Sequence, residues 1–208
     1  MPEKDFSSLP PFPWSGCGAN KERVGSRFSL YPLDNNYSQI ILESLARIEA
    51  SKIFSQTDAL STLFRGNLTH IFDCLSAFFI GAYRDERHLC LEGLVSCGCP
   101  GDCDSDSPPP TDDKRLNRFK LTKRDFPLKA KLSLYPLGIV DYLPIIAKVI
   151  RLAEQMGLNP RVIHYVTRID GAALKIFDYL EAAAMIVQKE VSHFVLHFTL
   201  SAGSHTLE

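Results

Sequence analysis

The chain has 208 residues, of which 45% are hydrophobic and 23% charged, with a formal net charge of −1 and a pI near 6.6. This composition is typical of a globular protein with one broad core or two small ones. The balanced charge argues against a nucleic acid, an anionic membrane or a polyanionic ligand as partner.

The start of the chain does not resemble a targeting segment. MPEKDFSSLPPFPWSG has acids and prolines where a secretory signal needs a basic start and an apolar core, and no later apolar run reaches the roughly 18 residues of a membrane span. Cys74 and Cys90 fall within apolar periodic runs, as reduced core cysteines do. We expect a cytoplasmic protein without membrane insertion, with residues 1–24 as an extended arm.

The first predicted element is a half-buried strand in RFSLY, residues 27–31. Phe28 and Leu30 alternate with Ser29 and Tyr31, so the two pairs face opposite sides of the strand.

A helix, a hairpin, a second helix and a last strand follow. The segment 34–36 offers N-cap side chains for the first helix, whose expected apolar face is Tyr37, Ile41, Leu45 and Ile48. Residues 52–66 predict two strands that turn at 56–58. Thr69 is expected to cap the second helix, and the last strand begins at His88. The order is β-α-β-β-α-β.

The same unit occurs twice. FSLYPL at 28–33 returns as LSLYPL at 132–137, an offset of 104, and after a one-residue insertion an offset of 105 aligns many further positions. These aligned pairs include Tyr37/Tyr142, Thr62/Thr167, Gly66/Gly171, Asp73/Asp178, His88/His193, Ser96/Ser201 and Gly98/Gly203. One shared offset over this length indicates an internal duplication.

The second copy predicts helices over 141–157 and 173–189 and a final strand over 193–203. This element order is the ferredoxin-like split βαβ. We therefore predict an α+β protein of tandem ferredoxin-like repeats, 25–103 and 128–204, joined by an exposed linker, 104–127. Each repeat would have a four-stranded antiparallel sheet with both helices on one face.

Two open sheet faces would remain, carrying Tyr31, Tyr135, Thr62, His88 and His193. We expect another sheet to cover each face, within the chain or across a dimer, with a pocket at the edge of the contact in each repeat.

Paired hydroxyls and rings are the main candidates for ligand contact. Ser29 with Tyr31, and Ser133 with Tyr135, stand two apart on one strand face, where they could bind and stack a flat heterocycle or simply suit a half-buried strand. Thr62 and Thr167 suit ligand contact or cross-strand pairing, and Ser96 and Ser201 share the strand face of the paired histidines.

Charged candidates have plainer alternatives. His88 and His193 are surface or ligand-binding histidines, and Asp73 and its counterpart in the second copy are expected to be solvated or to cap helices. Arg65 aligns with Asp170, so two pockets would differ in charge and in affinity.

No metal site or cofactor is expected. Cys97, Cys99 and Cys103 stand near Asp102 and Asp104, but C-x-C-x3-C lacks the spacing of a structural zinc site. No catalytic motif is present either. The residues alone predict a duplicated binding module. An enzyme using His88, His193 or Asp170 in acid–base chemistry and a regulatory protein-binding subunit remain as alternatives.

Several segments carry a family resemblance: SRFSLYPL, TDALSTLFRGNLTHIFD, GCPGD followed by DKRLN, LSLYPL, VIHYVTRIDGAALKIFDYLEAA and LSAGS. Together they resemble the YkoF-like family of thiamine/hydroxymethylpyrimidine-binding proteins over residues 25–204. The resemblance implies a homodimer with a thiamine or hydroxymethylpyrimidine site in each repeat. It also implies a non-catalytic cytoplasmic role in uptake or salvage of the precursor, with a functional link to a vitamin transporter.

Such a ligand presents ring-nitrogen acceptors, an amine and a flat face. The expected contacts are Ser29, Tyr31, Thr62 and Ser96 in the first copy and Ser133, Tyr135, Thr167 and Ser201 in the second. Asp58, Asp170 and His164 are further candidates for the amine or the thiazolium cation.

Overall fold

The computed structural model describes residues 22, 24–85, 87–99, 112–121 and 125–205. The expected N-terminal arm lies almost entirely outside them. The first repeat comprises β1 (Val24–Pro32), α1 (Tyr37–Ala46), β2 (Phe54–Thr57), β3 (Thr62–Arg65), α2 (Leu68–Ala82) and β4 (Leu89–Cys97). The second comprises β5 (Pro127–Leu137), α4 (Leu143–Gln155), β6 (Arg161–Ile163), β7 (Val166–Ala172), α5 (Ala173–Glu190) and β8 (His193–Ala202), and the linker contains α3 (Arg118–Leu121). The predicted element order is confirmed in both copies.

The eight strands form one antiparallel sheet, in the order β2-β3-β1-β4-β8-β5-β7-β6. The expectation of two separate four-stranded sheets is wrong, because β4 pairs with β8 from Leu89↔Ala202 to Cys97↔Phe194. Each of these strands would be the exposed edge of its own repeat, and pairing them satisfies backbone groups that a free edge leaves open. The sheet therefore has one continuous open face instead of two faces stacked on each other.

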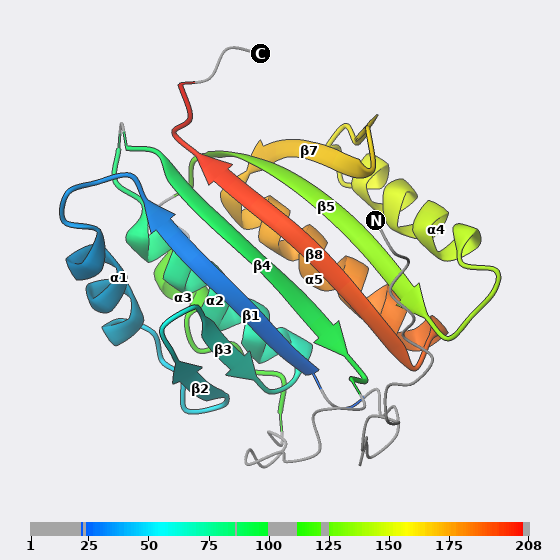
Figure 1. Ribbon diagram of the computed structural model, residues 1–208, viewed down its shortest axis with the longest axis horizontal. Helices are drawn as coiled ribbons and strands as arrows, with labels where there is room; N and C mark the ends of the chain where they lie inside the picture. The colour runs from blue at the N-terminus through cyan, green and yellow to red at the C-terminus, as the bar shows by residue number, and fades with distance from the viewer. Residues whose placement is uncertain (1–21, 23, 86, 100–111, 122–124, 206–208) are drawn as a thin grey trace, which may run out of the picture.

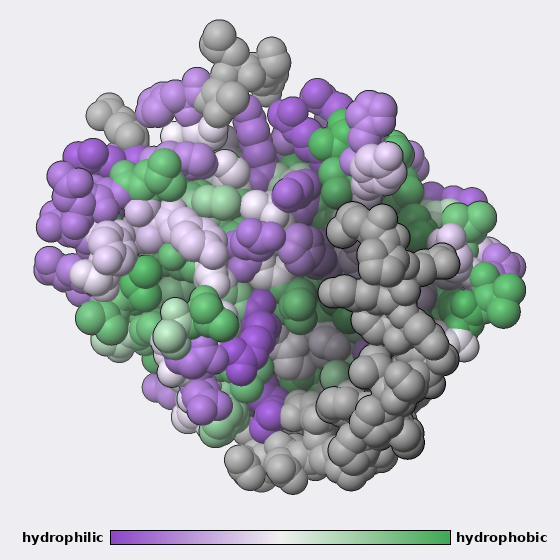
Figure 2. Space-filling model, in the orientation of Figure 1, coloured by the Kyte–Doolittle hydropathy of each residue, from purple (hydrophilic) through white to green (hydrophobic). Residues whose placement is uncertain are grey.

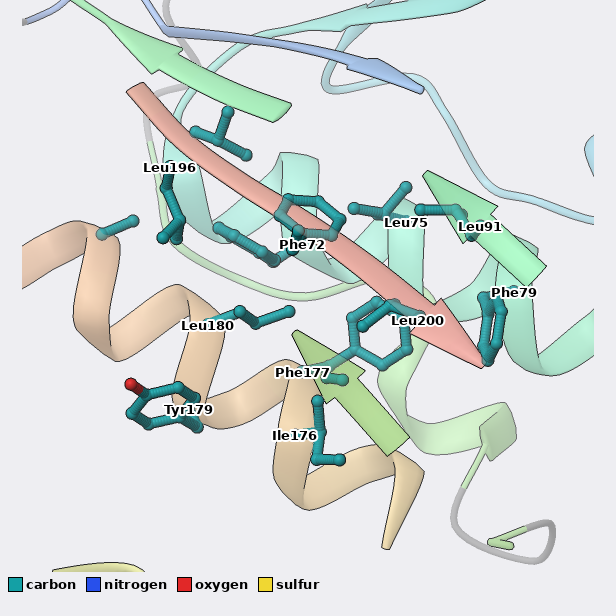
Figure 3. Packing of buried hydrophobic residues seen from close by; sticks show 14 of the residues in the cluster. Phe72, Leu75, Phe79, Leu91, Ile176, Phe177, Tyr179, Leu180, Leu196 and Leu200 are labelled. Atoms are coloured by element: carbon teal, nitrogen blue, oxygen red, sulfur yellow. The ribbon is translucent and has the colours of Figure 1, made fainter. Parts of the chain in front are cut away.

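All the helices cover the other face of the sheet (Figure 1). The apolar residues of α2 and α5 pack there against β4 and β8, so the core runs without a break across the two repeats (Figure 3). Phe72, Phe79, Phe177, Leu180 and Leu200 are each at most 2% exposed within it. Phe28 and Leu30 point into this layer as predicted, whereas Ser29 and Tyr31 do not. No helix of the described part is long and apolar enough to cross a membrane.

Of two local predictions about the helices, one is wrong and one is confirmed in part. Asn67, and not Thr69, caps α2, because its side-chain oxygen accepts a hydrogen bond from the backbone N–H of His70 at 2.9 Å. In α1, the expected face is confirmed for Ile41, Leu45 and Ile48, which pack against the core, but Tyr37 is exposed and Ile40 is buried in addition.

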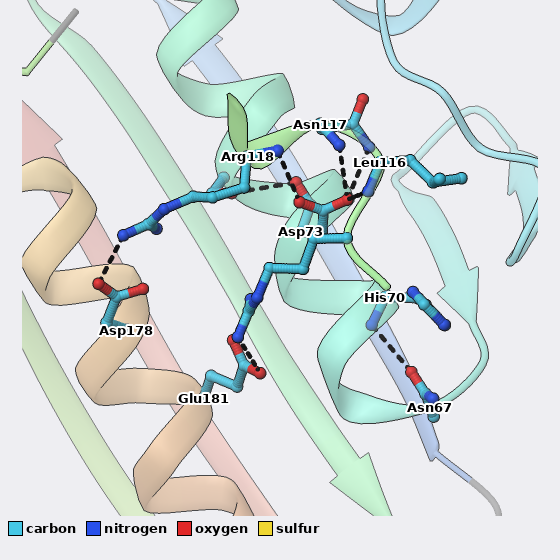
Figure 4. A network of polar contacts seen from close by, with 10 residues as sticks. Asn67, His70, Asp73, Leu116, Asn117, Arg118, Asp178 and Glu181 are labelled. Atoms are coloured by element: carbon cyan, nitrogen blue, oxygen red, sulfur yellow. Dashed lines mark hydrogen bonds and ion pairs between the residues drawn. The ribbon is translucent and has the colours of Figure 1, made fainter. Parts of the chain in front are cut away.

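The linker is not wholly exposed, contrary to expectation, since Asn117 and Leu121 are buried. Figure 4 shows why: the carboxylate of Asp73 on α2 accepts hydrogen bonds from the backbone N–H groups of Leu116, Asn117 and Arg118 at 2.8, 2.9 and 2.9 Å. Asp73 is itself buried, which corrects the expectation of a solvated or capping residue.

The same stretch of linker is bound to the second repeat. Arg115 makes two hydrogen bonds, of 2.7 and 2.8 Å, with the buried carboxylate of Glu181 on α5, and Arg118 contacts Asp178 at 2.6 Å (Figure 4). The duplicated pair Asp73 and Asp178 thus holds one linker from both sides.

We predict unequal costs for the two carboxylates. Asp73→Asn removes the charge that satisfies three backbone N–H groups, one buried and two partly buried, and should lower the free energy of unfolding by about 2 kcal/mol or more, measured by urea denaturation. Asp178→Asn is the matched control, because its ion pair is partly exposed and should cost under about 1 kcal/mol. Equal losses of unfolding free energy in the two variants would show that the hydrogen bonds of Asp73 stabilise the fold no more than the ion pair of Asp178.

Candidate functional site

The strand register arranges open-face residues in lateral rows. One row runs across β1, β4, β8, β5 and β7 through Tyr31, Cys90, Ser201, Lys129 and Asp170, and we call it the Tyr31 row. Hydrophilic and hydrophobic side chains are interspersed over this face of the molecule (Figure 2).

A second row is the duplicate of the first. It runs through Arg65, Gly25, Ser96, Val195 and Tyr135 across β3, β1, β4, β8 and β5, and we call it the Tyr135 row. The 104 and 105 offsets map every member of one row onto a member of the other. Each row therefore draws residues from both repeats.

This arrangement regroups the predicted contacts. Ser96 stands six residues along β4 from Cys90, the partner of Tyr31, which is about 20 Å in a strand. Tyr31 and Ser201, by contrast, are two strands apart in one row, roughly 10 Å. Ser29, Tyr31 and Ser96 are thus not brought together as one first-copy site.

A pocket of about 630 Å³ opens at the β7 side of the Tyr31 row. Its lining includes Ser201 and Asp170, which the sequence predicted, and Lys129, which it did not. Tyr83 and Phe126 form another wall, with their rings stacked at 3.8 Å between centroids and 21° between planes. No periodic pattern indicated these two aromatics, since one follows α2 and the other ends the linker.

The hydroxyl of Ser201 is held by the other repeat. Nε2 of His88, just before β4, lies 2.9 Å from Oγ of Ser201 on β8. The turn after β8 requires glycine at position 203, where φ is +66° and a Cβ would lie 2.4 Å from the backbone oxygen of Arg87. Gly98 plays the same part after β4, with φ of +78° and a Cβ position only 1.8 Å from the backbone oxygen of Ser192. The alignment of Gly98 with Gly203 in the sequence therefore indicates this close approach of the two repeats.

Asp170 is half-buried and already paired. Its two carboxylate oxygens accept hydrogen bonds of 3.0 Å each from Nε and Nη2 of Arg168, and Nη2 of Arg161 lies 3.9 Å away. The remaining lone pairs of this carboxylate can accept from an amine in the pocket.

A sequence profile described as the YKOF-related Family matches residues 23–102 and 128–206, one match per repeat. The chain belongs to this family. A relative from Bacillus subtilis (strain 168), named "Putative HMP/thiamine-binding protein YkoF", is 32% identical over 188 residues, 90% of this chain and 94% of the relative.

Two predicted contacts of this YkoF-related protein lie on the other side of the sheet. Thr62 pairs with Phe28, and Thr167 pairs with Leu132, and both apolar partners are buried against the helices. Thr62 is also buried, with its Oγ1 3.0 Å from Oγ1 of Thr57. The expectation that Thr62 belongs to the open face is wrong.

Other predicted residues lie away from the pocket. Ser29 donates from Oγ to the backbone oxygen of Leu60 at 2.9 Å, and Asp58 pairs with Arg27 at 2.7 Å, so both hold the β2–β3 turn against β1. Ser133 lies on the open face beside His197, and His164 is exposed in the turn between β6 and β7.

His193, Cys97 and Cys99 do not line the pocket. Burial lowers the pKa of His193, at the start of β8. Among the described residues no group of three or more His, Cys, Asp or Glu side chains could hold a metal ion. Asp102, Cys103 and Asp104 lie outside them.

We predict a pH-dependent contribution from Asp58. The hydrogen bond from Arg27, with those from the N–H groups of Leu60 and Ser61, lowers the pKa of Asp58 from 3.8 to about 2. A lowered pKa means that the ionised form stabilises the fold, so this contribution is complete above pH 3.8 and is lost as the pH falls towards 2.

The measurement is the difference in unfolding free energy between the unaltered protein and Asp58→Asn as a function of pH. It should be constant at neutral pH and shrink between pH 3.8 and 2. A difference that does not change over this interval would contradict the assignment.

Proposed function

We propose that this protein binds thiamine or its hydroxymethylpyrimidine moiety without altering it chemically. The observation that carries the proposal is the pocket at the end of the Tyr31 row, which combines a stacked aromatic wall, a hydroxyl and a carboxylate. The name of the Bacillus subtilis relative supports the same ligand.

The pocket matches the chemistry of an aminopyrimidine. The apolar wall of Tyr83 and Phe126 suits the flat ring, and Asp170 can accept a hydrogen bond from the exocyclic amine. Ser201 can donate to a ring nitrogen or accept from the amine, and His88 fixes its orientation at 2.9 Å. Pockets of this volume accommodate small heterocyclic molecules.

A second site is proposed at the Tyr135 row, giving one site for each repeat. Arg65 and Gly25 stand there in place of Asp170 and Lys129, so the two sites differ in charge and should differ in affinity. Ser96 and Tyr135 would supply the hydroxyls. The pocket lining does not include five of the predicted contacts, namely Ser29, Asp58, Ser133, Thr167 and His164, so no contact supports a ligand-binding role for them there. Ser133 would act at the second site, beside Tyr135.

The cellular setting is also proposed. The protein would act as a cytoplasmic homodimer in uptake or salvage of the thiamine pyrimidine, in functional connection with a vitamin transporter. The half-exposed rings of Tyr31 and Tyr135 on the open face suit contact with a second copy.

One observation favours a second candidate function. The contact between His88 and Ser201 places a base and a hydroxyl nucleophile at hydrogen-bond distance beside a pocket, which is the minimum for acyl transfer. If the unaltered protein hydrolyses a chromogenic ester and Ser201→Ala does not, the result supports an enzyme. If the unaltered protein does not hydrolyse the ester, the result supports a binding protein.

Calorimetry with thiamine and with hydroxymethylpyrimidine tests the binding function. Ser201→Ala and Asp170→Asn should each weaken the site at the pocket, which we call the second-repeat site, by about fivefold or more. The first variant removes a hydrogen bond to the ligand, and the second removes the negative charge of an acceptor. Ser96→Ala is the matched control and should leave this site unchanged while it affects the other. Binding that is absent in the unaltered protein, or indifferent to these variants, contradicts the proposal.

A double-mutant cycle tests the role of His88. If His88 acts by orienting Ser201, then His88→Ala weakens binding only when Ser201 is present, and the double variant binds like Ser201→Ala alone. Additive losses would indicate that His88 acts independently.

A further inference from the structure

Cations gather on the open face beside the pocket. Lys131 on β5 pairs with Arg168 on β7, which in turn pairs with Arg161 on β6, so three cationic side chains lie in one lateral row. Lys129, in the pocket lining, stands one row away on β5. Like charges directly opposite on neighbouring strands destabilise a sheet, so this arrangement calls for a negative partner.

The nearby carboxylates of the described residues do not balance the cluster. Asp170 is shared between Arg168 and Arg161, and Asp125, which also lines the pocket, accepts from the N–H of Leu174 at the start of α5. Glu92 stands two strands from Lys131 and lies 3.3 Å from His197. Within the described part of the chain, Lys131 therefore has no ion pair and Arg161 has only the shared Asp170 at 3.9 Å, although the whole chain is nearly neutral.

The first repeat lacks this cluster. Leu63 and Gly25 occupy the positions of Arg168 and Lys129. Arg27, at the position of Lys131, is paired with Asp58 at 2.7 Å and Ser61 at 2.8 Å. Because the first repeat forms the same strand pairing without the cations, the fold does not need them. The cations lie beside the row end at which the pocket opens, and this position connects them with the ligand.

We propose that the second-repeat site takes a phosphorylated ligand, a phosphate ester or diphosphate of thiamine or of its pyrimidine, with the phosphate over Lys131 and Arg161. This inference rests on the proposed function. Lys131 is two residues along β5 from Lys129, about 7 Å, which a phosphate carried by a ring in the pocket can span. Lysine and arginine donors hold phosphate oxygens through charge-assisted hydrogen bonds. The positive charge beside the pocket thus favours an anionic ligand, although the near-neutral net charge of the chain argues against one.

Calorimetry at low salt with thiamine, thiamine monophosphate, thiamine pyrophosphate and inorganic pyrophosphate tests the site. The phosphorylated forms should bind about tenfold or more tightly than thiamine, and this advantage should shrink at high salt. Lys131→Glu and Arg161→Gln should each reduce the advantage about threefold to tenfold, and Lys131→Glu should not weaken the binding of thiamine itself.

Both altered residues are exposed, so the fold should be retained, as checked by circular dichroism. Lys189→Gln, an exposed lysine at the end of α5, is the matched control.

The outcomes separate the two proposals. Equal binding of thiamine and its phosphates, unchanged in the variants, overturns the phosphate site and leaves the binding function standing. If neither a thiamine compound nor hydroxymethylpyrimidine binds, the proposed function fails. In that case, inorganic pyrophosphate binding that Lys131→Glu abolishes and Lys189→Gln preserves would still support the anion site, and pyrophosphate binding indifferent to Lys131 would overturn it.

Discussion

The pairing of β4 with β8 is the interaction on which the rest of the structure depends. Each strand would otherwise be the open edge of a ferredoxin-like repeat, and their hydrogen bonds join two half-sheets into one. The pairing aligns the helices of both repeats over a common core, so that α2 and α5 pack together. It also leaves the opposite face uninterrupted from β2 to β6.

The site follows from the same pairing. Because β4 and β8 are antiparallel, the end of one lies beside the start of the other, and the histidine of one repeat reaches the serine of its neighbour. Gly203 and Gly98 permit the close approach of the chain at these two corners. The duplication makes the two corners alike in backbone, while Asp170 against Arg65 and Lys129 against Gly25 make them chemically different. Divergence after duplication has therefore acted on charge more than on architecture.

The sequence predicted what local patterns determine. Alternation identified the buried side of β1 through Phe28 and Leu30, and the repeat offset aligned residues that occupy equivalent positions in the two rows. The sequence could not predict the β4–β8 pairing, because that contact joins residues about a hundred positions apart and leaves no periodic trace. Thr62 was assigned to the wrong face because β3 is too short for its own pattern to decide, and only its register with Phe28 does. The burial of Asn117 could not be predicted from the polar sequence of the linker, because it depends on a hydrogen bond to the distant Asp73.

Amide hydrogen exchange, followed residue by residue, tests the central claim most directly. If β4 and β8 are inner strands of one sheet, the N–H groups by which they face each other should be protected as strongly as those facing β1 and β5, with opening free energies close to that of global unfolding. Rapid exchange of the mutually facing amides, alongside protection of the rest, would show that the repeats keep separate sheets and would contradict the account.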